Sequence, residues 1–147
     1  MFFGVLFSLS RLFAYIQGNN DEAVKINMTA PVLVNIHPRT GPLQNLSLIV
    51  HFYMPQKFQR NPPQSTEAHP VKLPQHKFVA VRRFGGFMDD SNISAQMSAL
   101  KKSLKGTAWE SSIPKKHSGD SLLYSAAGYN SPFEYENRVN EVMLWFD

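Results

Sequence analysis

Helical and strand-like stretches follow one another along this chain in an order that constrains the fold more than any other feature. One helical pattern precedes two apolar, β-branched runs, and a third run then precedes a second helical pattern and two more runs. The order is therefore α-β-β followed by β-α-β-β, which indicates an internal repeat whose first copy lacks its opening strand. We expect helices over residues 5–17 and 91–105, and strands over residues 25–36, 46–54, 77–84, 122–129 and 140–146.

This order predicts an α+β fold. Its sheet would be mostly antiparallel and curved around a central space, built from two pseudo-twofold β-α-β-β repeats, with two flanking helices and the first strand of the first repeat missing. Pro31 cannot donate to a strand ladder, so we expect an edge position or a bulge there. The 147 residues suffice for one domain. We place the first half-repeat at about 5–55, the second at about 71–147, and a Pro-rich connection over 55–75.

The first twenty residues, MFFGVLFSLSRLFAYIQGNN, are strongly apolar. The uninterrupted apolar part ends before Arg11, whereas a membrane-spanning helix needs roughly 20 apolar residues. A secretion signal would begin with a basic segment, but no Lys or Arg precedes the apolar run. We therefore favour a core-facing helix over a secretion signal, with Gly18 ending the helix. Its apolar stripe would consist of Val5, Leu9, Leu12, Phe13 and Ile16.

The composition excludes several chemistries. The chain has no cysteine, so disulfides, thiolate ligation of zinc or haem and cysteine nucleophiles are excluded. The net charge is only +4, and the basic residues are scattered in pairs, which disfavours nucleic-acid binding. Neither a G-x-S-x-G nor an H-E-x-x-H pattern occurs, and we predict that the chain is not an enzyme. We expect a cytoplasmic monomer or weak dimer without a transmembrane segment.

Five stretches point to a known family: RLFAYIQGNN, KINMTAPV, FYMPQKFQRNPP, VAVRRFGGF and AGYNSPFEYENRVNEVMLWF. They occur in this order between Arg11 and Phe146, and together they resemble the SOUL haem-binding protein family, most of all its plant members. The resemblance implies a distorted barrel of two β-α-β-β halves, similar to bacterial effector-binding domains. It also implies non-covalent binding or carriage of haem and other tetrapyrroles at a hydrophobic site, without turnover. Relatives that carry a signal sequence would be extracellular.

A porphyrin is a flat apolar ring with two propionates, so it needs apolar walls and cations at its edge. Within the resembling stretches, aromatic side chains could stack on the ring, basic ones could pair with propionates, and a thioether could ligate iron or fill a gap. Each residue also has a structural interpretation, as barrel core or as surface charge. The candidates are Tyr15, Tyr129 and Phe133 for stacking, Lys25 and Arg138 for the propionates, and Met28 for the gap or the iron.

One histidine differs from the other four. In LSLIVHFYM, His51 shares a strand face with Ile49 and Tyr53, so it is the best candidate for an axial iron ligand, although a structural role is favoured. Histidine ligation is not uniform in the family that the chain resembles, so we predict no dedicated metal site. The remaining histidines are expected at solvated surface, and these are His37, His69, His76 and His117.

Two alternatives to tetrapyrrole binding remain open. The chain could be an effector-binding module for other amphipathic small molecules, which would bind broadly and without preference for porphyrins. It could also be a protein-interaction domain that acts through the helix at 91–105, whose Met97, Leu100 and Leu104 form an apolar stripe. The same stripe is equally suited to pack against a sheet, and a buried stripe would leave no surface for a partner.

Overall fold

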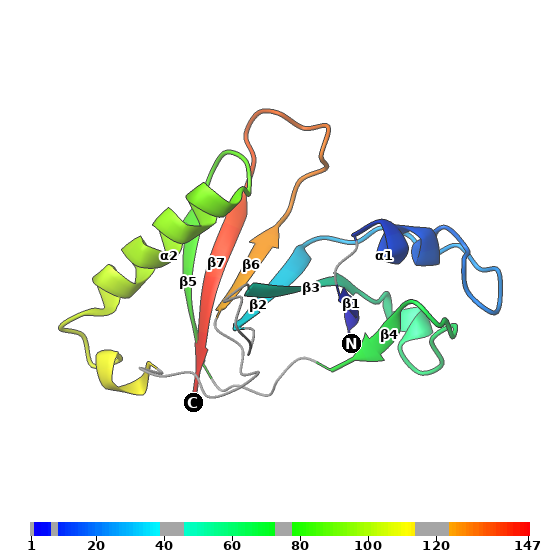
Figure 1. The fold of residues 1–147 in the computed structure, drawn as a ribbon, viewed down its shortest axis with the longest axis horizontal. Helices are drawn as coiled ribbons and strands as arrows, with labels where there is room; N and C mark the ends of the chain where they lie inside the picture. The colour runs from blue at the N-terminus through cyan, green and yellow to red at the C-terminus, as the bar shows by residue number, and fades with distance from the viewer. Residues whose placement is uncertain (1, 7–8, 39–45, 73–77, 114–123) are drawn as a thin grey trace.

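The computed structural model describes residues 2–6, 9–38, 46–72, 78–113 and 124–147 (Figure 1). The described helices are α1 (Leu9–Ile16) and α2 (Asp90–Leu104), and two 3-10 turns are η1 (Gln56–Phe58) and η2 (Glu110–Ser112). The described strands are β1 (Phe2–Leu6), β2 (Val32–Pro38), β3 (Leu46–Tyr53), β4 (His69–Val71), β5 (Phe78–Phe84), β6 (Tyr124–Gly128) and β7 (Asn140–Phe146).

The described strands form one antiparallel sheet in the order β4-β1-β3-β2-β6-β7-β5. Counted inward from the two sides, β1-β3-β2 has its counterpart in β5-β7-β6, and β2 pairs with β6 in the middle. The chain order repeats in the same way, as β1-α1-β2-β3 and then β5-α2-β6-β7. These observations confirm the predicted α+β fold and its pseudo-twofold repeat. The sheet is not closed, which fits a distorted barrel.

The prediction that the first strand of the first repeat is missing is wrong. β1 pairs with β3, from Phe2 opposite Tyr53 to Leu6 opposite Ile49, and its other edge pairs with β4. The helix predicted from residue 5 begins instead at Leu9. Three of the five residues of β1 (FFGVL) are aromatic or β-branched, and such residues favour strands. An apolar stripe alone could not distinguish a strand followed by a helix from one longer helix.

The strand predicted over residues 25–36 starts later than expected. β2 begins at Val32, immediately after Pro31, and it lies between β3 and β6 in the middle of the sheet. A central strand needs its backbone N–H groups for the ladders on both sides, so a proline can precede it but cannot interrupt it. Pro31 is therefore neither an edge residue nor a bulge. The other predicted strands agree with β3, β5, β6 and β7 within two residues, although residues 77 and 122–123 lie outside the described part.

Both helices cover the same face of the sheet. α1 places Leu12 in a core cluster with Phe52 of β3, and α2 places Met97 in a second cluster with Ile36 of β2. Phe52 lies opposite Val32, and Val32 and Ile36 are four residues apart on one strand. Because strand side chains alternate between faces, Phe52, Val32 and Ile36 point to the same side. The sheet therefore has a face covered by helices and a second face that carries neither α1 nor α2.

The helix stripes were predicted with unequal success. On α2, Met97 and Leu100 are buried against the sheet as expected, so this stripe leaves no free surface for a partner. The helix is capped by Asp89, whose carboxylate accepts a hydrogen bond from the Asn92 N–H at 2.8 Å. On α1, the predicted stripe is only partly buried, because the helix is rotated so that Tyr15 enters the core. Leu12 and Ile16 are buried with Tyr15, whereas Leu9 and Phe13 are exposed.

The second face of the sheet, which we call the helix-free face, is buried at its centre. A chain of polar groups crosses this centre: the Trp145 indole N–H donates to Ser125 Oγ at 2.9 Å, and Ser125 Oγ–H donates to Asn35 Oδ1 at 2.7 Å. The Trp145 indole N–H and the Ser125 hydroxyl therefore each have an acceptor, as buried polar groups require. The buried residues at the centre of this face are Leu33, Asn35, His51, Ser125 and Ala127.

Candidate functional site

Five strand termini meet at one end of the sheet. Val32, at the start of β2, lies opposite Phe52 near the end of β3 and opposite Gly128 at the end of β6. Asn140, at the start of β7, lies opposite Gly128 and opposite Phe84 at the end of β5. The segment before β2, the β5–α2 connection and the β6–β7 loop therefore all leave the sheet at this end. Figure 1 shows the last two together at the top of the view.

These segments expose a group of large apolar side chains, which we call the apolar rim. Phe133 is 82% exposed, Tyr135 is 71% exposed and Met28 is 51% exposed. Phe87 and Tyr135 are in ring contact, and large apolar side chains exposed close together indicate an interaction site. The rim consists of Met28, Tyr53, Phe87, Tyr129, Phe133 and Tyr135.

The β6–β7 loop, which carries half of the rim, is held by its own polar contacts. The Arg138 guanidinium donates to the carbonyl oxygens of Ser131 at 2.8 Å and Glu134 at 2.6 Å. The same guanidinium lies 4.7 Å from the centre of the Phe87 ring, which in turn contacts Tyr135 at 6.1 Å between ring centres. Arg138, predicted as a propionate partner, is thus already bonded to the loop and positions its aromatic side chains.

Tyr129 is fixed at the helix-free side of the rim. Its hydroxyl donates to Glu141 Oε2 at 2.7 Å. Burial raises the pKa of Tyr129 to about 12, and the hydrogen bond and charge of Glu141 add to this, while the positive charge of Arg83 acts in the opposite direction. The tyrosine is therefore protonated at neutral pH, and the hydrogen bond to Glu141 orients its hydroxyl. Glu141 and Arg83 lie directly opposite each other on β7 and β5.

Two of the predicted site residues lie with α1 and not in the rim. Tyr15 is buried in the core, and its hydroxyl donates to the Pro63 carbonyl oxygen at 2.8 Å. Burial raises the pKa of Tyr15 to about 12, with smaller contributions from the charges of Asp21 and Glu22. Lys25 is exposed, and its side chain passes beside Gly18 at the end of α1.

His51 lies on the helix-free face, two positions before the rim residue Tyr53 on β3. It is 5% exposed, and among the residues that the structure describes neither of its ring nitrogens has a hydrogen-bond partner. Burial, with a smaller contribution from the charge of His37, lowers the pKa of His51 to about 4. The imidazole is therefore neutral at physiological pH, as an iron ligand must be, but its nitrogens are covered.

The other histidines add no ligand cluster. His37 lies in β2 and is half-buried, so it is not at fully solvated surface as predicted, whereas His69 is exposed on β4 as predicted. His76 and His117 lie outside the described residues. Among the residues that the structure describes, no group of three or more His, Cys, Asp or Glu side chains could hold a metal ion.

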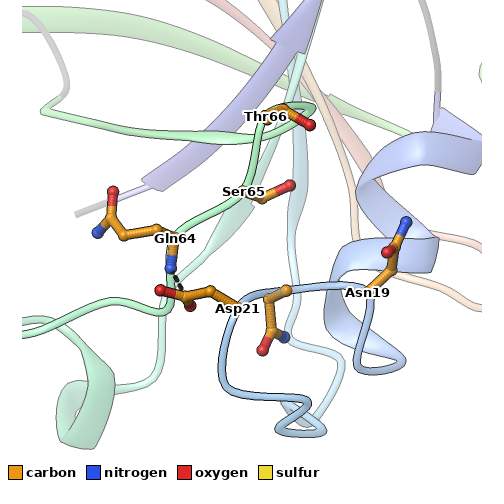
Figure 2. Close-up of a pocket in the computed structure, with 6 residues that line it drawn as sticks. Asn19, Asp21, Gln64, Ser65 and Thr66 are labelled. Atoms are coloured by element: carbon orange, nitrogen blue, oxygen red, sulfur yellow. Dashed lines mark hydrogen bonds between the residues drawn. The ribbon is translucent and has the colours of Figure 1, made fainter.

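Two hollows in the described residues do not match a porphyrin. The first, of about 420 Å³, is open and lined by residues with polar side chains. Figure 2 shows Asp21 across from Gln64, whose backbone N–H donates to the Asp21 carboxylate at 2.6 Å. The second is apolar, but its volume of about 230 Å³ lies below the roughly 300 Å³ at which small-molecule sites begin. Its lining comprises Phe78, Val79, Ala80, Leu104, Trp109 and Phe146. The structure therefore favours the exposed rim over these hollows as the candidate site.

Sequence reasoning named three residues of the rim, Met28, Tyr129 and Phe133, and missed the other three. Phe87 follows Gly85-Gly86, and Tyr135 follows Pro132 by three positions. Aromatic residues next to such turn signals are placed at loop tips, and that signal could have identified both. Tyr53 was recognised only as a neighbour of His51 on a strand, because the end of β3 could not be located precisely from sequence.

The doubled β-α-β-β sheet, with both helices on one face and an exposed apolar rim, defines a class of α+β proteins built by internal repetition. A family model described as SOUL heme-binding protein matches residues 5–145. The chain belongs to this family.

Individual relatives agree with this assignment. The chain is 33% identical to human heme-binding protein 2 over 138 residues, which cover 92% of the chain and 62% of the relative. It is 30% identical to mouse heme-binding protein 1 over 139 residues, covering 93% of the chain and 68% of that relative. Mouse heme-binding protein 2 is 31% identical over 136 residues. The chain thus spans about three fifths to two thirds of the length of these relatives. Within the described residues, no helix has the length and apolarity that crossing a membrane would demand.

Proposed function

We propose that this chain binds haem and related tetrapyrroles non-covalently at the apolar rim and carries them without chemical turnover. The observation that carries the proposal is the cluster of exposed aromatic and methionine side chains at the end of the sheet. The family is named for haem binding, and the relatives above carry the same activity in their names. Flat aromatic side chains suit a flat macrocycle, because ring stacking contributes favourable energy beyond the apolar area that is buried.

The energy required is within the reach of such a surface. A micromolar dissociation constant corresponds to about −8 kcal/mol. At about 25 cal/mol per Å², burial of roughly 330 Å² of apolar surface supplies that amount before the costs of association, and an association cost of about 4 kcal/mol raises the required area to roughly 490 Å². Since each face of a porphyrin can contact several rim side chains, we expect micromolar affinity. Iron ligation is not needed for this estimate, so metal-free protoporphyrin should bind about as well as haem.

The test is a parallel titration of the purified chain with haem and with metal-free protoporphyrin, followed by absorbance and by tryptophan fluorescence. Similar micromolar affinities for both would support a hydrophobic tetrapyrrole carrier. Binding of haem alone, with a sharpened Soret band, would show that iron ligation dominates, and His51 would then be the first residue to replace. Binding of neither by the folded protein would refute the proposal.

The rim can be tested against a matched control. Phe133 in the rim and Phe13 on α1 are both exposed phenylalanines, but only the former belongs to the rim. We expect Phe133→Ala to weaken porphyrin binding several-fold and Phe13→Ala to leave it unchanged. If Phe13→Ala weakens binding and Phe133→Ala does not, the binding site lies at α1 and not at the rim.

A second candidate function is an effector-binding module for other amphipathic molecules. The openness of the rim favours it, because exposed side chains on loops select less strictly by shape than an enclosed pocket does. It predicts comparable affinities for porphyrins and for unrelated apolar dyes of similar size. A preference of tenfold or more for protoporphyrin over such dyes would exclude it.

A further inference from the structure

We propose that Arg83 receives a carboxylate of the ligand at the rim and thereby makes the site selective for acidic tetrapyrroles over neutral apolar molecules. This inference rests on the proposed function and adds to it the residue that recognises the acidic groups.

Arg83 is placed on the right face and at the right end of the sheet. Its neighbours in β5 point the other way: Phe84 is buried in the α2 cluster, and Arg82 Nε donates to Gln96 Oε1 of α2 at 2.8 Å. Because strand side chains alternate, Arg83 points to the helix-free face. It lies opposite Glu141, which binds the hydroxyl of the rim residue Tyr129. The cation therefore stands at the helix-free side of the apolar rim.

Arg83 is also free to accept an anion. Its side chain is exposed, and within the described part of the chain its guanidinium makes no hydrogen bond or ion pair. An arginine fork can hold a carboxylate through two parallel N–H donors, which gives direction as well as attraction. Glu141 is the nearby opposing charge, and its Oε2 already accepts the Tyr129 hydroxyl. Its negative charge weakens the attraction of Arg83 for an anion without removing it.

The two basic residues predicted for this role, Arg138 and Lys25, are less suitable than Arg83, and so is the neighbouring Arg82. Arg138 Nη1 already donates to two loop carbonyl oxygens, its guanidinium lies over the Phe87 ring, and its Nε is buried. Lys25 lies beside Gly18 at the end of α1. Arg82 lies on the opposite face of the sheet, where it contacts α2. Among these four cations, Arg83 alone combines an unoccupied guanidinium with a position next to the rim.

Arg82 and Arg83 provide a closely matched pair for the test. Arg83→Gln and Arg82→Gln remove the same charge from adjacent positions of one strand, but on opposite faces. We expect Arg83→Gln to weaken protoporphyrin binding about tenfold and Arg82→Gln to change it less than twofold. Nile red, a neutral apolar dye, serves as the second probe, and both variants should bind it as the unmodified chain does. Circular dichroism establishes that each variant is folded.

Two further variants should change the affinity for protoporphyrin in opposite directions. Arg83→Lys keeps the charge but loses the fork, and it should retain part of the affinity. Glu141→Gln keeps an acceptor for Tyr129 but removes the opposing charge, and it should tighten protoporphyrin binding two- to threefold. The affinity of the unmodified chain for protoporphyrin should also fall with added salt, and this dependence should be weaker in Arg83→Gln.

The outcomes separate this inference from the proposed function. If the unmodified chain binds protoporphyrin and Arg83→Gln binds it equally well, the role of Arg83 is refuted while the proposed function stands. If Arg82→Gln weakens binding as much as Arg83→Gln, the effect is one of net charge and the assignment to the rim is also refuted. If the unmodified chain does not bind protoporphyrin at all, both proposals fall together.

Discussion

Replacing His51 by leucine should stabilise the protein, and the gain should grow as the pH falls. The imidazole is buried on the helix-free face with both ring nitrogens lacking partners. An unsatisfied buried polar group costs about 1–3 kcal/mol, and a leucine of similar size carries no such group. We therefore expect His51→Leu to raise the free energy of unfolding by about 1–2 kcal/mol at pH 7.5, where the histidine is neutral in both the folded and the unfolded chain.

The pH dependence follows from the pKa of His51, which burial lowers to about 4 in the folded protein from its ordinary value of 6.5. Between these pH values the unfolded chain binds a proton at His51 that the folded chain does not bind. The free energy of unfolding is therefore unaffected by His51 titration above pH 6.5 and decreases as the pH falls toward 4. At pH 5 the unmodified chain should have lost about 2 kcal/mol through this residue, and the full difference below pH 4 is about 3.4 kcal/mol.

The assay is urea unfolding of the unmodified chain and of His51→Leu at pH 7.5 and pH 5, followed by far-ultraviolet circular dichroism. The other histidines titrate in both proteins, so the difference between the two unfolding free energies isolates His51. We expect that difference to increase by about 2 kcal/mol between the two pH values. A difference that is independent of pH would show that His51 is not a buried neutral imidazole. A less stable leucine variant at pH 7.5 would show that the ring nitrogens have partners.

Three further substitutions test the core and the caps, each read from urea midpoints at pH 7.5. Asp89→Ala removes the side chain that caps α2 and should cost about 1 kcal/mol, whereas Asp89→Asn should cost little. Leu100→Ala opens a cavity between α2 and the sheet and should cost about 3 kcal/mol; a loss below about 1 kcal/mol would contradict its burial. Tyr15→Phe leaves the Pro63 carbonyl without its donor and should cost about 1–2 kcal/mol, and an unchanged midpoint would refute that contact.

The repeat of the fold could be predicted from sequence because periodicity records which side chains are buried. Met97 and Leu100 are spaced as one face of a helix, and they pack on the sheet as that spacing predicts. The strand predicted over residues 140–146 likewise has the bounds of β7, in which every second residue is buried. These patterns depend only on the spacing of neighbouring residues, so they can be recognised in a single sequence.

The opening strand could not be predicted because its reason is not local. β1 is a strand by virtue of ladders to β3 and β4, whose residues lie more than forty positions away along the chain. The burial of Tyr15 has the same origin, since its hydroxyl meets Pro63 from a distant segment. A helical stripe drawn from the first twenty residues contains neither partner, so it placed the helix start and the exposed face incorrectly.

Only part of the candidate site could be predicted, because the exposure of its side chains also depends on distant contacts. Sequence motifs pointed to Tyr129 and Phe133, but whether an aromatic side chain is exposed depends on where the loop around it is held. Arg138 looks like a free cation in the sequence, and only the fold reveals that loop carbonyl oxygens and Phe87 surround it. Arg83 shows the converse: two adjacent arginines cannot be told apart until the strand assigns them to opposite faces.

The pairing of β2 with β6 sets the order in which this chain can fold. Within each half, β2 and β3 form a near neighbour pair, and β6 and β7 form another. The ladder that joins the halves brings together residues as far apart as Asn35 and Ser125, which are separated by 90 positions. Closing so long a loop is entropically costly and slow, so contacts within the halves should form first and the central ladder last. Until it forms, β2 and β6 each present an unsatisfied edge, and either could pair with the same edge of another molecule. Refolding yield should therefore fall as protein concentration rises, even though the finished sheet buries both edges.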